Sequence, residues 1–201
     1  RKESSAASDV YKRQLFDMAN ILRNFQDYEG AIEIYSNLIR YPNYSAEEYA
    51  DLLYKRGTSY ERKKDFLKAD EDLIESLKID PDEPYVLNYL GYSWLERSYK
   101  IPEAMDMLKE AYSLRENDPY ITDSIGWAYY LIKDFVNAKK YLEKAVKLMP
   151  YDPIVNDHYG DVLWRLNKKV QARYFWNGVL KLEDTEEKLK KEIEKKLVFG
   201  L

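Results

Sequence analysis

The feature that most constrains this chain is a pattern of small residues and prolines that recurs every 34 residues. In the clearest copy, residues 119–152, Gly126 stands at position 8 and Pro150 at position 32. Ala138 and Ala145 stand between them, at positions 20 and 27. A glycine on one helix and alanines on the next let the two helices pack closely, and a proline ends the second helix because it cannot donate a backbone hydrogen bond. The period therefore predicts stacked helical hairpins.

The same register can be followed through five copies, at residues 12–45, 50–83, 84–118, 119–152 and 153–186. The residues expected to make the close helix contacts are Gly57, Ala69, Gly91, Ala104, Ala111, Gly126, Ala138, Ala145, Gly160 and Ala172. The copy at 84–118 has one extra residue near Tyr99 to Ile101, where Pro102 can open the second helix. The first copy matches less well, as terminal repeats often do.

Two further signals agree with this register. Asp118-Pro119 and Asp152-Pro153 each combine an N-cap acceptor with a proline suited to the first helical position. After the last copy, Thr185 is a possible N-cap for a helix with a thin apolar stripe formed by Leu189, Ile193 and Leu197. We interpret residues 185–201 as a capping helix that closes the array, with a docking helix for a partner as the alternative.

The composition suits helices. The chain has 34% charged residues, only 7 glycines and 7 prolines, and no apolar run long enough to span a bilayer. We therefore predict an all-α fold: a right-handed α-solenoid of tandem helix-turn-helix hairpins over residues 15–184, followed by the capping helix.

The beginning of the chain reads differently from the repeats. Residues Asp9–Gln14 back-translate to a DNA sequence that resembles the transposon end used in sequencing-library preparation. We interpret residues 1–14 as a non-native or disordered lead-in and leave them out of the fold prediction; a genuine polar, partly helical segment is the alternative. With this interpretation, the lack of a visible signal peptide or lipid-attachment cysteine carries no information about secretion.

Three stretches sharpen the class of repeat: NYLGYSWLER from Asn88, DSIGWAYY from Asp123 and DHYGDVLW from Asp157, followed by Ala172 and Trp176. Together they resemble the tetratricopeptide repeats (TPR) of bacterial cell-envelope proteins. Some members of that group are outer-membrane lipoproteins that bring substrates to a periplasmic protease. The resemblance implies a protein-binding adaptor and favours a bacterial periplasmic or outer-membrane-associated location, with the cytoplasm as the alternative.

In this kind of repeat, positions 2, 5, 9 and 12 of the first helices tend to face a concave groove. Here they are Tyr85, Asn88, Tyr92 and Leu95, then Tyr120, Asp123, Trp127 and Tyr130, then Ile154, Asp157, Asp161 and Trp164. The aromatic and polar members form the predicted partner-binding groove, because rigid aromatic side chains give large contact area at low entropic cost. Burial of several rings between hairpins is the alternative.

Position 5 carries a polar residue in three successive copies, namely Asn88, Asp123 and Asp157. Such a column could accept hydrogen bonds from an extended peptide or bind its Lys and Arg side chains. It could equally form a ladder of hydrogen bonds between adjacent first helices, and both readings can hold together.

Little in the sequence points to catalysis. Cysteine is absent, and the only histidine, His158, could form a metal site only with Asp157 and Asp161, a grouping that is usually solvated. Glycine-rich phosphate loops and zinc-ligand spacings are missing. We predict no cofactor, no metal and no enzymatic activity. The net charge of -4, with mixed signs along the chain, disfavours nucleic acid. A protein or peptide partner is expected, with homo-oligomeric assembly as the alternative and an enzyme as a distant third.

Overall fold

The computed structural model describes residues 2–201, with side chains from residue 10 onward, and this part of the chain forms eleven α-helices. It divides into two compact units, one ending at Ser93 and one beginning at Trp94. The first unit holds α1 (Lys2–Asn24), α2 (Tyr28–Ile39), α3 (Ala46–Arg62), α4 (Phe66–Ile79) and most of α5 (Pro84–Glu96). The second holds α6 (Ile101–Leu114), α7 (Pro119–Leu131), α8 (Phe135–Leu148), α9 (Pro153–Arg165), α10 (Lys169–Val179) and α11 (Glu187–Phe199).

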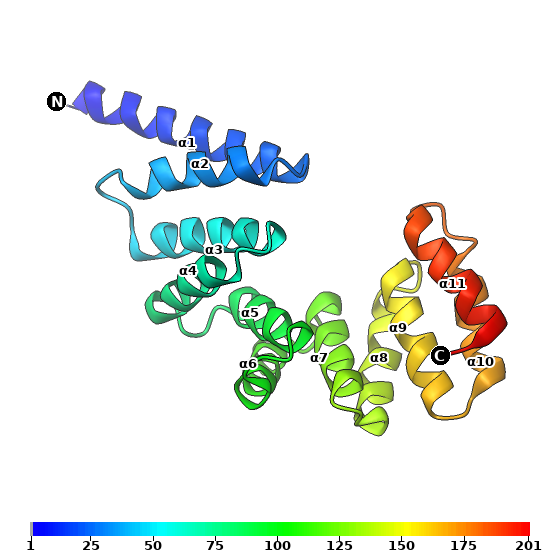
Figure 1. The fold of residues 1–201 in the computed structure, drawn as a ribbon. Helices are drawn as coiled ribbons and strands as arrows, with labels where there is room; N and C mark the ends of the chain where they lie inside the picture. The colour runs from blue at the N-terminus through cyan, green and yellow to red at the C-terminus, as the bar shows by residue number, and fades with distance from the viewer. Residues whose placement is uncertain (1) are drawn as a thin grey trace. The chain divides into compact units, whose positions relative to one another are not determined.

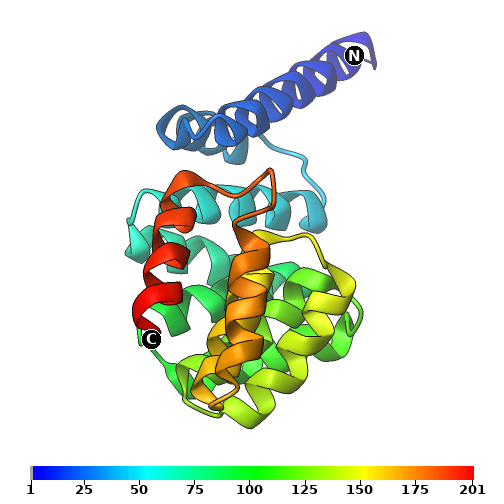
Figure 2. The same ribbon diagram turned by 90° about the vertical axis from the view of Figure 1, so that its right-hand side faces the viewer.

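Within each unit, consecutive helices pair as hairpins and successive hairpins stack (Figure 1). In the first unit α2 packs against both α1 and α3, and the fully buried Tyr35 donates its hydroxyl to Asn20 Oδ1 at 2.7 Å. In the second unit α8 packs against α7 and α9, and α11 packs against α10. Figure 2 shows α11 and α10 side by side from a second direction. The all-α hairpin fold predicted from the sequence is confirmed.

Helix starts follow the local chemistry read from the sequence. The Asp118 carboxylate accepts from the backbone N–H groups of Tyr120 and Ile121, both at 3.0 Å, and Pro119 fills the first turn of α7. Asp152 caps α9 in the same way. These caps satisfy amide groups that have no partner inside the helix.

Every hairpin turns through a residue in the left-handed region, and none of these residues is glycine. The five are Gln26, Lys64, Ser98, Lys133 and Asn167, with φ between 53° and 66°. All stand at repeat position 15, two or three residues before the second helix. The long copy absorbs its extra residue with a second left-handed residue, Lys100 at φ 42°, before α6 begins. A non-glycine residue pays about 1 kcal/mol or more for this conformation.

The glycines of the repeat lie at close contacts between the helices of one hairpin. A Cβ placed on Gly126 of α7 would lie 2.7 Å from Cγ of Leu142 on α8. One placed on Gly160 of α9 would lie 2.5 Å from the indole of Trp176 on α10. The alanines of the second helices, among them Ala138, are fully buried. Small side chains therefore set the distance between paired helices.

The two ends of the chain differ in detail from the expectations. Thr185 is not the N-cap of α11; its hydroxyl donates to the carbonyl of Val179 at 2.7 Å, satisfying the end of α10, and Glu186 occupies the cap position. The stripe of α11 buries Ile193 fully and leaves Leu189 9% exposed. At the other end, α1 runs through residues 2–14, and the origin of that segment stays a prediction. In residues 2–201 no helix combines the length and apolarity needed to cross a membrane.

Candidate functional site

The predicted groove residues lie on α5, α7 and α9, and each unit is taken by itself. Position 2 is exposed in all three copies, with Tyr85 42%, Tyr120 64% and Ile154 49% exposed. Tyr85 belongs to the first unit, whereas Tyr120 and Ile154 lie at the starts of the neighbouring first helices α7 and α9 in the second. Among the residues at positions 2, 5, 9 and 12, these side chains face solvent most clearly, although Ile154 was not part of the predicted aromatic and polar groove.

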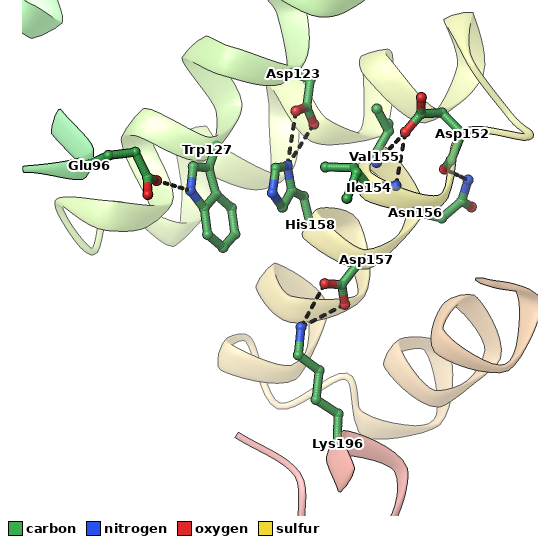
Figure 3. A network of polar contacts seen from close by, with 10 residues as sticks. All are labelled: Glu96, Asp123, Trp127, Asp152, Ile154, Val155, Asn156, Asp157, His158 and Lys196. Atoms are coloured by element: carbon green, nitrogen blue, oxygen red, sulfur yellow. Dashed lines mark hydrogen bonds and ion pairs between the residues drawn. The ribbon is translucent and has the colours of Figure 1, made fainter. Parts of the chain in front are cut away.

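Trp127 is held in a cluster of rings rather than projecting alone. Its indole stacks on Tyr130 at 4.5 Å and 9°, and on His158 at 3.9 Å and 13°. Its Nε1 donates to Glu96 at 3.0 Å (Figure 3). Tyr130 in turn accepts from Arg165 Nε at 3.2 Å. The cluster leaves Trp127 partly exposed but fixes its orientation.

His158 connects two adjacent first helices. Its Nδ1 lies 2.9 Å and 3.1 Å from the two carboxylate oxygens of Asp123 (Figure 3). Burial alone would lower the pKa of His158, but the Asp123 charge and hydrogen bond outweigh burial and raise it. The imidazole therefore holds its proton more tightly beside this buried carboxylate than it would in water.

Lys196, which the sequence did not mark, lies between two predicted groove acceptors. Its ammonium group is 2.6 and 2.8 Å from the oxygens of Asp157 and 2.8 and 2.9 Å from those of Asp161. Figure 3 shows the side chain reaching Asp157 from α11. Asp161 also accepts from Trp176 Nε1 at 3.0 Å. Burial and the neighbouring Asp157 charge raise the pKa of Asp161 to about 6, because two carboxylates share one ammonium group.

These contacts show which partners the polar residues at repeat position 5 have in the second unit. Asp123 of α7 pairs with His158 of α9, and Asp157 of α9 pairs with Lys196 of α11. Asp161 is 4% exposed and also engaged by Lys196. The column is thus a ladder between helices, and the carboxylates of Asp157 and Asp161 are occupied by the chain itself.

The remaining predicted residues are partly buried. Trp164 packs against Trp176 at 5.3 Å, and a Cβ on Gly200 would lie only 2.0 Å from its ring, so the end of α11 covers it. On α5, Tyr92 is partly buried, and Asn88 Oδ1 is buried with no hydrogen-bond partner in the described part of the chain.

The three residues considered for a metal do not form a metal site. Lys196 occupies the carboxylates of Asp157 and Asp161, and His158 faces Asp123 instead. Across the described residues, no group of three or more histidine, cysteine, aspartate or glutamate side chains is placed to hold a metal ion.

Fold and surface together define a repeat protein of stacked hairpins whose first helices carry exposed apolar side chains. The family profile described as "Tetratricopeptide repeat" matches residues 50–83 and 124–152. The chain therefore contains tetratricopeptide repeats, and its fold is that of tetratricopeptide repeat proteins.

Sequence relatives agree. The TPR repeat-containing protein PA4667 of Pseudomonas aeruginosa is 33% identical over 144 residues, which is 71% of this chain and 23% of that protein. Human aspartyl/asparaginyl beta-hydroxylase is 28% identical over 169 residues, 78% of this chain and 21% of that protein. The chain thus spans less than a quarter of the length of the curated relatives it matches.

Solved structures show the same fold. TTC0263, a thermophilic TPR protein of Thermus thermophilus, superposes with a TM-score of 0.77 at 14% identity, covering 92% of this chain and 98% of that one. The Pseudomonas aeruginosa protein pilF gives a TM-score of 0.73 at 20% identity, covering 93% of this chain and 84% of that one.

Proposed function

We propose that this chain is a non-catalytic scaffold that binds an extended polypeptide through the exposed position-2 side chains of its first helices. The observation that carries the proposal is the pair Tyr120 and Ile154, 64% and 49% exposed at equivalent positions of neighbouring helices. Side chains repeated at one position of successive helices present contacts at regular intervals, which suits an extended segment.

The ladder supports this role because it makes the surface rigid. Asp123 and His158 tie α7 to α9, and Lys196 ties α9 to α11. A surface whose backbone and neighbouring rings are already fixed loses little entropy when a ligand binds, so more of the contact energy appears as affinity. Tyr120, an aromatic side chain with few rotatable bonds, is the natural contact residue.

A finer role belongs to the same proposal. The resemblance to cell-envelope repeat proteins supports an adaptor that presents bound polypeptides to an envelope protease or assembly machine, and the Pseudomonas relative is a bacterial TPR repeat-containing protein. This role would place the protein in the bacterial periplasm or at the outer membrane.

The test is selection from a phage-displayed library of random dodecapeptides. Peptides selected on the unaltered protein should bind a Tyr120→Ala, Ile154→Ala variant about 10- to 100-fold more weakly, because centrally placed anchors contribute about 2 kcal/mol or more. The matched control is Val170→Ala, Tyr174→Ala, which removes side chains that are 85% and 75% exposed on the second helix α10. Equal binding by the two variants, or no enriched peptide, would overturn the proposal.

Self-assembly is the second candidate, and it rests on α1. Three apolar side chains, two in this helix and one directly after it, face solvent, with Met18 47%, Ile21 54% and Phe25 82% exposed. Apolar side chains spaced along one helix are common contacts between copies of a chain. Light scattering over a dilution series tests this: a dimer that Phe25→Asp dissociates supports it, and a monomer at every concentration removes it.

A further inference from the structure

The first unit contains an acidic and aromatic cavity, and Tyr85 is the one residue of its lining that the predicted groove included. It has a volume of about 410 Å³ and lies among α3, the end of α4 and the start of α5. Its lining residues are Glu47, Ala50, Asp51, Tyr54, Ser76, Asp80, Glu83, Tyr85 and Val86. Four of these carry carboxylates, and none of them carries a cationic group.

Aromatic rings form part of the lining. Tyr54 packs edge-to-face on Tyr89 at 6.1 Å and 85°, which fixes its ring, while the ring of Tyr85 stays 42% exposed. Burial raises the pKa of Tyr54; the charge of Arg23 lowers it, and Glu83 and Asp51 raise it, so the ring is partly desolvated beside one cation and two carboxylates. An aromatic face and a carboxylate are the two groups that bind a cationic side chain together.

The carboxylates are only partly compensated by the chain itself. Lys55 lies 3.3 Å from Asp51, whose side chain is still 45% exposed. Glu83 accepts the backbone N–H groups of Tyr85 at 2.6 Å and Val86 at 3.0 Å, so it caps α5. The four carboxylates do not converge on one point as metal ligands would. Their spread instead suits a long side chain with a charged end.

In the second unit, a site with the same kinds of group, carboxylates and an aromatic ring, is filled by a lysine side chain. There the ammonium group of Lys196 is bound by Asp157 and Asp161 and lies 5.9 Å from the centroid of the Trp176 ring. That site is an acidic and aromatic recess already occupied by a lysine from the same chain. The cavity of the first unit has the same kinds of group without a lysine or arginine in its lining.

We propose that this cavity binds the cationic side chain of a lysine or arginine in the partner polypeptide, next to Tyr54 and Tyr85. The inference rests on the proposed polypeptide-binding function and adds the chemistry of one recognised residue. A segment that presents a basic residue here gains a charge-assisted contact in a partly desolvated site.

The test uses two pentapeptides, acetyl-Gly-Gly-Arg-Gly-Gly-amide and its citrulline counterpart, which has nearly the same shape but no charge. Each is titrated to tens of millimolar while NMR follows the ring signals of the tyrosines. The arginine peptide should shift the Tyr54 and Tyr85 signals saturably and bind at least about 5-fold more tightly than the citrulline peptide, with the difference shrinking at high salt.

Asp51→Asn, Asp80→Asn should abolish the preference for arginine. The matched control, Glu71→Gln, Asp82→Asn, removes two exposed carboxylates of the same unit that do not line the cavity and should leave the preference intact. Glu83 is left unchanged because it caps α5. Circular dichroism checks that both variants are folded.

Equal binding of the two peptides, no saturable shift, or a preference that survives in the Asp51, Asp80 variant would overturn the inference. None of these outcomes involves Tyr120 or Ile154, so failure here leaves the proposed function standing. Conversely, if the library selection enriches no peptide, this titration still tests whether the cavity binds a cationic side chain.

Discussion

Replacing Lys196 by methionine removes the one ammonium group that lies between Asp157 and Asp161. The lysine side chain is 16% exposed and the two carboxylates are 11% and 6% exposed, so none of the three charges is well solvated. Methionine keeps most of the volume of the lysine stem, and the change therefore acts mainly through charge.

The magnitude follows from leaving two buried carboxylates without their cation. Removing one partner of a buried ion pair costs about 3–5 kcal/mol. That cost depends on pH here, because Asp161 already has a pKa raised to about 6 and will rise further once Lys196 is gone. Below its pKa Asp161 is neutral, and one of the two uncompensated charges disappears. We expect a loss of about 3–5 kcal/mol at pH 8, and a loss smaller by about 1.4 kcal/mol or more at pH 5, since one pKa unit is worth that much.

Urea unfolding followed by tryptophan fluorescence measures this in the correct part of the chain. All four tryptophans, namely Trp94, Trp127, Trp164 and Trp176, belong to the second unit. Lys195→Met, which removes an exposed lysine from the same helix, is the control and should change the stability by less than about 0.5 kcal/mol. A Lys196→Met protein as stable as the control at pH 8, or one destabilised more at pH 5 than at pH 8, would refute the reasoning.

Three further predictions concern single positions. Gly160→Ala should lower the melting temperature because its Cβ would lie 2.5 Å from an indole of α10, whereas Gly178→Ala, with nothing within 4 Å, should be neutral or raise it. Lys133→Gly should stabilise the protein by about 0.5–1 kcal/mol in thermal unfolding, because Lys133 has φ 66°. NMR titration should give His158 a pKa above 6.5, which Asp123→Asn lowers. His158 binds its proton more tightly in the folded than in the unfolded protein. Its stabilising contribution is therefore complete below pH 6.5 and is lost as the pH rises through the folded pKa. A free energy of unfolding that does not change from pH 6 to pH 8 would contradict this.

The hairpins could be predicted because their determinants are local. Gly126 and Ala138 are small because two helix backbones approach each other, and Pro119 stands where an amide group would have no partner. These requirements recur with the repeat, so one good copy predicts the others. The position-15 turns were missed because lysine and serine give no sequence signal of a left-handed conformation, although the shared position supplies one once a single turn is known.

The site was harder to predict because it depends on the rotation of one helix against the next. From the sequence, the residues at position 5 fitted a peptide contact and a ladder of hydrogen bonds between helices equally well. Only the pairing of Asp123 with His158 in the structure shows that the ladder forms. Lys196 lies outside the repeat, on a helix rich in lysines, and nothing in its sequence context separates it from Lys195. Asp157 and Asp161 accept hydrogen bonds from this lysine of the same chain, and their role toward a partner stays a prediction.

The ladder gives the repeats of the second unit a direction. The aspartate of each rung lies on one first helix and its cation on a helix later in the chain: Asp123 of α7 pairs with His158 of α9, and Asp157 of α9 pairs with Lys196 of α11. A repeat inserted between α10 and α11 must therefore bring an acid for Lys196 and a cation for Asp157. Removing α11 leaves Asp157 and Asp161 without their cation at the new end, whereas removing helices from the other side of a rung leaves a histidine that can simply lose its proton.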